Sequence, residues 1–314
     1  MDMENKNSNF KSKLLNQPQT VSGGLVYSAS VIGMAIISFI FVIAITAVAT
    51  SLQTTTEILS QKNWYKYLSY ILYQIVYVAI IIAYAFLYRK KPAEIGYRKT
   101  HFKYFLIALL LGFGLLFGLN FVNNLFALAI EKLGGKIPVA SLPSLKGGGI
   151  VGVLIVVALL PAVLEESIFR GIILNSTKQL GTVSCCLLGG LLFSIFHQNP
   201  LQTVYQFICG VAFTLLAVRS GSILPTILAH FLNNAVIIFN ERFGFLNALN
   251  ITQSTIIYVV AGIALVLSLV YLIFFDKKTN AKKQTSAKPF ILSALAGIIL
   301  CAILWISALA SYFM

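Results

Sequence analysis

The chain has 314 residues, of which 58% are apolar and 10% are charged, and its mean hydropathy is +0.88. Soluble domains carry about 25% charged residues, so this composition excludes a soluble globular, disordered or collagen-like protein. The 23 Lys and Arg residues exceed the 9 Asp and Glu residues, which gives a formal net charge of +14. In so apolar a chain, this basic surplus indicates membrane topology rather than nucleic-acid binding.

Nine apolar stretches follow one another along the chain. A spanning helix needs about 20 mostly apolar residues. The predicted spans are 25–50, 67–88, 104–130, 149–172, 181–197, 202–219, 222–240, 254–275 and 290–313. The fifth, sixth and seventh are short and closely spaced, so they are expected to include tilted, re-entrant or buried helices. The sequence therefore predicts an all-α, polytopic transmembrane helix bundle with eight or nine spans.

Composition divides the chain into four predicted segments. They are a polar N-terminal tail (1–22), N-terminal transmembrane helices (23–148), a helical core (149–240) and C-terminal transmembrane helices (241–314). The first apolar run is too long for a signal-peptide core and is expected to be retained. In the third span, Gly114 and Gly118 form a small-xxx-small pair that permits close helix approach.

Charge placement predicts the orientation. With nine spans and the N-terminus inside, the inner loops hold seventeen of the Lys and Arg residues and the outer loops hold six. Most of this margin comes from two inner segments, 89–103 and 277–288. By the positive-inside rule the N-terminus is expected to be cytoplasmic, and the bilayer is the first expected partner, with anionic lipids as a secondary possibility.

Ionisable side chains inside a membrane are costly and mark candidate functional sites. Of the nine acidic residues, only Glu165 and Glu166 lie within a predicted span. Of the three histidines, His197 and His230 lie in or at the end of apolar segments. The cysteines match no zinc or disulfide spacing and are expected to pack in the core: Cys185, Cys186, Cys209 and Cys301.

The two adjacent carboxylates differ in their position on the helix. Glu166 and Arg170 are four residues apart and share a face, so an ion pair would offset part of the cost of burying both. Glu165 lies about 100° away around the helix and can meet a different partner. Pro161 is expected to kink the helix one turn earlier, which opens space beside Glu165. One carboxylate is therefore expected to be structural and the other reactive.

The histidines lie on two further helices. His230 and Asn234 are four residues apart and project together, as do Phe193 and His197. Gly189–Gly190 lets another helix approach closely. If the three helices converge, a carboxylate, two imidazoles and an amide share one cavity, where they can activate water and stabilise an oxyanion. Each residue alone has a structural interpretation, and only the combination indicates catalysis.

These three segments resemble the signature of the CPBP family of intramembrane endopeptidases, the CAAX proteases and bacteriocin-processing enzymes also called Abi. The family pattern is Glu-Glu-x-x-x-Arg, then Phe-x-x-x-His, then His-x-x-x-Asn or Asp. The chain matches it in order, over roughly residues 150–240, with Glu165, Glu166, Arg170, Phe193, His197, His230 and Asn234. The resemblance implies an endopeptidase whose active site lies within the membrane.

The resemblance also implies roles for these residues. It assigns water activation to Glu165 and His197. It assigns the oxyanion site to His230 and Asn234, and the structural support to Glu166 and Arg170. No cofactor is expected, but a carboxylate with two imidazoles is also a zinc ligand set. Zinc held by Glu165, His197 and His230 therefore stays open, although the chain lacks an HExxH motif.

The expected function is hydrolysis of a peptide bond in a membrane-associated peptide or protein. Prenylated CAAX proteins, peptide precursors and ordinary membrane proteins all remain open as substrates. Asp2 and Asp276 lie outside the spans, which disfavours an aspartyl protease, and the absence of a GxSG turn disfavours a rhomboid-like one. Two alternatives are a catalytically dispensable scaffold, immunity or regulatory protein of the same family, and a transporter or proton pathway, which usually has internal repeats.

Overall fold

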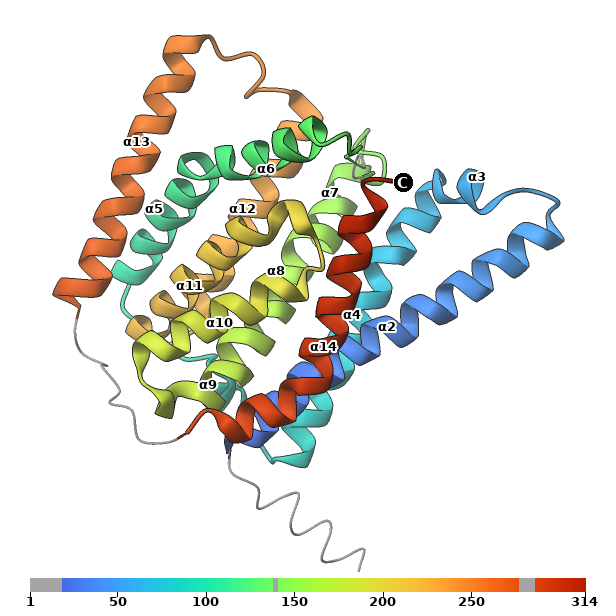
Figure 1. Cartoon of the computed structure of the whole chain (residues 1–314). Helices are drawn as coiled ribbons and strands as arrows, with labels where there is room; N and C mark the ends of the chain where they lie inside the picture. The colour runs from blue at the N-terminus through green and yellow to red at the C-terminus, as the bar shows by residue number, and fades with distance from the viewer. Residues whose placement is uncertain (1–18, 138–140, 277–285) are drawn as a thin grey trace, which may run out of the picture.

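The computed structural model describes residues 19–137, 141–276 and 286–314, and over these residues the chain is helical without any strand (Figure 1). The predicted all-α bundle is confirmed. The first part comprises α2 (Gln19–Ser51), α3 (Thr56–Ser60), α4 (Asn63–Leu87), η1 (Pro92–Ile95), α5 (Lys103–Gly118) and α6 (Asn120–Lys132). An interrupted helix follows, made of α7 (Gly149–Val153), η2 (Leu154–Leu159), α8 (Leu160–Glu166), η3 (Ser167–Ile173) and α9 (Leu174–Thr177).

The second half of the chain continues the bundle. Its elements are η4 (Lys178–Leu180), α10 (Thr182–Phe196), η5 (Pro200–Gln202), α11 (Thr203–Ser220), α12 (Leu224–Phe243), α13 (Ile251–Val270), η6 (Tyr271–Phe275) and α14 (Lys288–Ser311). Successive long helices run in opposite directions, and the start of α2 and the C-terminus lie at opposite ends of the bundle (Figure 1). The predicted division of the chain into four segments stays a prediction. Helices from different predicted segments pack together, since α14 contacts α2 and α13 contacts α5.

The predicted count of eight or nine spans is wrong. Over the described ranges, seven helices are long and apolar enough to cross a membrane. The fifth predicted span corresponds to α10, which has 15 residues and is therefore about 22 Å long. This length is shorter than the hydrocarbon core of a bilayer, which is roughly 30 Å thick. The seventh became α12, whose 20 residues include one His, three Asn and two charged residues. Apolar runs in the sequence do not distinguish a span from a short helix packed inside the bundle.

Small residues bring pairs of helices into close contact. A Cβ atom at Gly114 would lie 2.7 Å from the Leu265 backbone nitrogen, so α5 and α13 approach closely at this point and the expectation for Gly114 is confirmed. A Cβ at Gly118 would be 3.5 Å from its nearest neighbour, which is an ordinary contact. At Gly190 a Cβ would lie 2.9 Å from the Phe207 carbonyl oxygen, so α10 and α11 also cross tightly.

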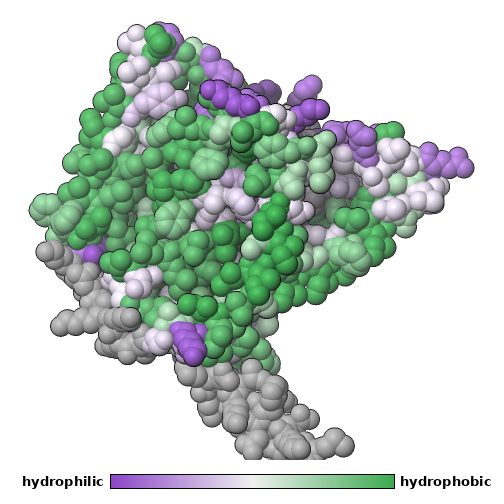
Figure 2. All heavy atoms as spheres, in the orientation of Figure 1, coloured by the Kyte–Doolittle hydropathy of each residue, from purple (hydrophilic) through white to green (hydrophobic). Residues whose placement is uncertain are grey.

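The outer surface suits contact with lipid. Large apolar side chains are exposed along the helices, for example Phe39 (67%), Ile82 (62%) and Leu267 (61%). Figure 2 shows apolar residues covering the middle of the visible face and hydrophilic residues gathered towards its upper end. A soluble protein rarely exposes so large a contiguous apolar area. Together with the seven long apolar helices, this surface indicates a multi-pass integral membrane protein.

Candidate active site

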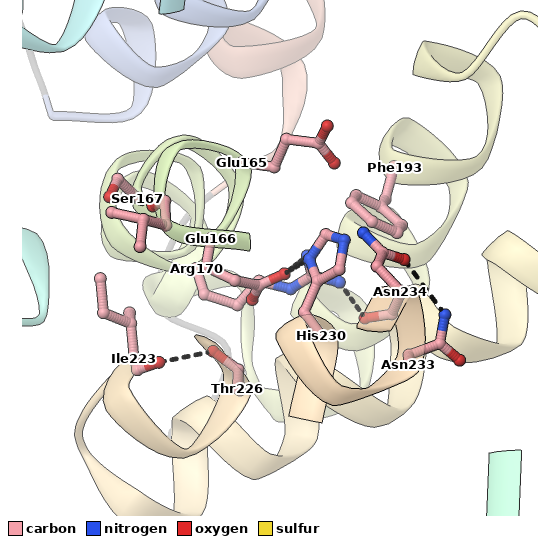
Figure 3. Close-up of polar contacts among 12 residues, drawn as sticks. Glu165, Glu166, Ser167, Arg170, Phe193, Ile223, Thr226, His230, Asn233 and Asn234 are labelled. Atoms are coloured by element: carbon pink, nitrogen blue, oxygen red, sulfur yellow. Dashed lines mark hydrogen bonds and ion pairs between the residues drawn. The ribbon is translucent and has the colours of Figure 1, made fainter. Parts of the chain in front are cut away.

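The four predicted catalytic residues line one cavity of about 760 Å³. Glu165 comes from α8, His197 directly follows α10, and His230 and Asn234 come from α12. Figure 3 shows Glu165 turned away from Glu166, while His230 and Asn234 lie beside Phe193. The structure thus brings together the three segments that the sequence analysis combined.

The helix that carries both carboxylates has an irregular backbone. Two π-helical segments, η2 and η3, flank α8. Pro161 has no N–H to donate to the Val157 carbonyl one turn earlier. The side-chain amide of Asn234 donates to this Val157 oxygen instead, at 3.4 Å. Short π-helical segments are frequent at functional sites, and η2 and η3 lie on either side of the helical turn that carries Glu165. The predicted kink at Pro161 stays a prediction, although η2 ends two residues before this proline.

Glu165 and His197 face each other across a short gap. The His197 Nε2 lies 3.9 Å from Glu165 Oε2, too far for a direct hydrogen bond. The His197 Nδ1 is 2.7 Å from the Phe193 carbonyl oxygen, which can only accept, so Nδ1 carries a proton. In the neutral imidazole, Nε2 therefore presents its lone pair to Glu165. Two acceptors at this separation can both receive hydrogen bonds from one bridging water.

Glu166 is fully buried and is paired with the side chains of Arg170 and His230. Its Oε1 accepts from Arg170 Nη1 at 2.8 Å and from His230 Nδ1 at 3.0 Å. The side chains of Glu166 and Arg170 are both 0% exposed. The pairing of Glu166 with Arg170 follows the sequence prediction. The contact with His230, 64 residues away, was not predicted, because i,i+4 spacing identifies partners only within one helix.

Aromatic rings surround the buried guanidinium and the two imidazoles. The Arg170 guanidinium carbon lies 4.3 Å from the centre of the Phe193 ring, a cation–π distance, and its Nη2 donates to the Gly210 carbonyl at 3.2 Å. The same Phe193 ring meets the ring of His197 edge-on at 4.6 Å between centroids and the ring of His230 at 6.1 Å. Phe193 therefore packs in the core and also fixes the orientation of both imidazoles.

A chain of hydrogen bonds holds the amide side of the site. The Tyr205 hydroxyl donates to Asn233 Oδ1 at 2.7 Å, and Asn233 Nδ2 donates to Asn234 Oδ1 at 3.3 Å. Asn234 Nδ2 donates one of its two N–H groups to the Val157 carbonyl, and the second has no acceptor among the described residues. Asn233 and Asn234 both line the cavity. The sequence could not tell which of these adjacent asparagines faces the site, and the structure brings both to it.

Several cavity residues lie outside the sequence pattern. Gln74 and Tyr77 come from α4, Asn123 from α6, and Gln202 and Gln206 from η5 and α11. Gln74 was detectable in principle, because it is a polar residue in the middle of an apolar span. Asn123 and Gln206 are also polar residues within predicted spans, but which of them faces the cavity depends on how the helices pack.

The residues of this cavity do not form a zinc site in the observed arrangement. Among the described residues, no group of three His, Cys, Asp or Glu side chains lies close enough together to hold a metal ion. His230 directs Nδ1 at Glu166 rather than joining Glu165 and His197. The four cysteines are free and buried, as expected for core residues.

Comparison with known families identifies the central part of the chain. Residues 147–236 match the family model described as type II CAAX prenyl endopeptidase Rce1-like. The comparisons find no match among curated proteins or solved structures. The matched range contains the interrupted helix, α10, α11 and the part of α12 that carries His230 and Asn234. The chain therefore carries a domain of the Rce1-like CAAX endopeptidase (CPBP) family, a family of proteases, over residues 147–236.

Proposed function

We propose that this protein is an intramembrane endopeptidase that hydrolyses a peptide bond in a membrane-associated peptide or protein. The observation that carries this proposal is the 3.9 Å gap between Glu165 Oε2 and His197 Nε2, in a cavity that His230 and Asn234 also line. A water in this gap would donate one hydrogen bond to each acceptor and direct an oxygen lone pair away from both. A substrate carbonyl carbon placed there would meet a polarised nucleophile.

The proposed reaction has two steps. The water oxygen bonds to the carbonyl carbon while Glu165 takes one of its protons, and the carbonyl oxygen becomes an oxyanion. The C–N bond then breaks as the protonated Glu165 gives this proton to the leaving nitrogen, which yields a carboxylic acid and an amine. No metal is needed to balance either step, because water supplies the nucleophile and Glu165 carries the proton.

His230 and Asn234 would stabilise the oxyanion. Because His230 Nδ1 donates to Glu166, donation to the oxyanion requires a second proton on Nε2. The resulting imidazolium would lie beside the Glu166 carboxylate, which offsets its charge. Asn234 would contribute the second N–H of its amide. Glu166 and Arg170 would act through His230 and Phe193, as positioning residues rather than catalytic ones.

A Glu165→Gln variant tests the base assignment. We expect peptide cleavage in proteoliposomes to fall by about 10²- to 10⁴-fold, the usual contribution of a positioned base. The thermal stability should be retained, because Glu165 Oε2 has no hydrogen-bond partner in the described part of the chain. Glu57→Gln, at an exposed acid in α3, is the matched control. Peptide masses compared between cells with wild-type and variant protein would also identify the substrate.

The result also separates the proposed enzyme from its alternatives. Full turnover by Glu165→Gln would refute the base assignment. A cellular phenotype that survives Glu165→Ala without cleavage would support the scaffold, immunity or regulatory alternative, and proton or solute flux in proteoliposomes would support a transporter.

We also propose that the N-terminus faces the cytoplasm. This proposal rests on the sequence, in which seventeen Lys and Arg residues fall in the expected inner segments and six in the outer ones. The two helices that are not candidate spans, α10 and α12, still reverse the chain, so the corrected span count leaves this division unchanged.

A further inference from the structure

The wall of the cavity opposite α12 is polar but uncharged. On α4, the residues Tyr70, Tyr73, Gln74 and Tyr77 have the spacing of one helix face, and all four line the cavity. Asn123 from α6 lies on the lining as well. This wall lies outside residues 147–236, so the family match does not account for it.

Two carboxamides on this wall have unmet hydrogen-bonding capacity. Gln74 is 7% exposed, and its Oε1 is buried with no hydrogen-bond partner in the described ranges. Asn123 Oδ1 and Glu165 Oε2 are likewise buried without a hydrogen-bond partner in the described ranges. Gln74, Asn123 and Glu165 all line the same cavity. A buried acceptor without a partner is destabilising, so proteins usually pair it unless function requires otherwise.

We infer that Gln74 and Asn123 form a substrate-binding subsite that accepts backbone N–H groups from an extended, uncharged peptide segment beside Glu165. This inference rests on the proposed function and specifies its substrate class. A carboxamide oxygen accepts from a peptide N–H, and only an unwound segment has free N–H groups, because a helix uses its own. The subsite would hold the peptide while Glu165 and His197 activate the water.

The charge of the lining restricts the substrate further. Among the described residues that line the cavity there is no Lys or Arg, and Glu165 is the only acid. An acidic side chain buried here would meet no Lys or Arg and would be repelled by Glu165. The segment inside the cavity is therefore expected to carry no acidic side chain.

The test uses Gln74→Met, which keeps the length of the side chain but removes its hydrogen-bonding groups. The probe is an internally quenched peptide of ten uncharged residues with an acyl anchor, cleaved by the full-length protein in proteoliposomes. We expect the KM to rise about 2- to 10-fold, the effect of one lost hydrogen bond, with kcat nearly unchanged. Asn123→Leu should also raise the KM and leave kcat nearly unchanged. Gln61→Met, the same change at an exposed position, is the control.

Stability distinguishes a binding role from a structural one. If Gln74 serves the substrate, Gln74→Met removes an unsatisfied acceptor, so the variant should unfold at the same or a higher temperature than the wild type. If Gln74 only supports the fold, the variant should unfold at a lower temperature. Lower stability with an unchanged KM would overturn the inference.

An ester scan identifies the hydrogen bond itself. In each peptide of a series, one backbone N–H of the probe is replaced by an ester oxygen. The wild type should lose affinity at one or two positions, and Gln74→Met should be insensitive at one of them. An identical pattern in both proteins would overturn the inference, as would equally efficient cleavage of a probe with Asp at the central positions.

Binding of the same peptides to Glu165→Gln, measured by fluorescence anisotropy, separates this inference from the proposed function. Weaker binding of an ester peptide that depends on Gln74 would support the subsite even if the wild type cleaved no peptide. Loss of cleavage in Glu165→Gln without any ester effect on binding would support only the assignment of Glu165 as the base. Failure of wild type and Glu165→Gln alike to bind the probe would overturn the subsite.

Discussion

The buried ion pair between Glu166 and Arg170 gives the sharpest test of how this site is built. Arg170→Met removes the guanidinium but keeps most of the apolar stem. It would leave the Glu166 carboxylate, which is 0% exposed, without its guanidinium partner, while the contact with His230 remains. It would also remove the donor to the Gly210 carbonyl and the cation–π contact with Phe193 at 4.3 Å. Breaking a buried pair from one side costs about 3–5 kcal/mol, so we expect Arg170→Met to be strongly destabilised.

The opposite single variant is Glu166→Gln, which leaves the fully buried guanidinium of Arg170 without its counter-ion. Its expected cost is also about 3–5 kcal/mol. The double variant buries no unpaired charge, and the Gln oxygen still accepts from His230. We therefore expect it to lie within about 2 kcal/mol of the wild type and to be more stable than either single variant.

Unfolding in mixed detergent, followed by the fluorescence of the two tryptophans, measures the three variants against the wild type. The diagnostic quantity is the order of stabilities, because coupling in a buried pair makes the double variant recover what each single variant lost. Losses that simply add, with the double variant the least stable of all, would refute the idea that charge compensation holds this site together. Single variants as stable as the wild type would refute it as well.

Two further predictions concern the fold and its orientation. Gly114→Ala should destabilise the protein by about 1–3 kcal/mol, because the added Cβ would meet the Leu265 backbone at 2.7 Å. Gly262→Ala is the control and should leave the stability unchanged, because its Cβ would have nothing within 4 Å. Equal stabilities of the two variants in thermal unfolding would contradict the tight α5–α13 contact. In intact cells, a membrane-impermeant maleimide should label Lys62→Cys but not Lys178→Cys, against a low background because the four native cysteines are buried. The reverse pattern would place the N-terminus outside.

Local periodicity was sufficient to predict which side chains share a helix face, but not which side chains meet between helices. The spacing of Glu166 and Arg170 predicted their contact, because the α-helix fixes which residues share a face. The pairing of His230 with Glu166 depends on how α12 packs against α8, which one sequence does not encode in any local pattern. For the same reason Gln74 and Asn123 were not predicted as cavity residues, although Gln74 interrupts an apolar run.

The error in the span count and the geometry of the site have the same physical cause. At about 22 Å, α10 cannot reach from one surface of the hydrocarbon core to the other. Its last carbonyl groups therefore end inside the protein, where each must find a donor because no lipid can supply one. His197 supplies one of these donors, as its Nδ1 bonds to the Phe193 carbonyl at 2.7 Å.

This bond determines which nitrogen of His197 faces Glu165. Since Nδ1 is committed to the end of α10, Nε2 is the nitrogen left for the cavity. A longer α10 would pair the Phe193 carbonyl with a backbone N–H of its next turn and release Nδ1. His197 could then adopt either tautomer, and only one of them would present a lone pair to the attacking water. A helix too short to span the bilayer is therefore what fixes the proton on this imidazole.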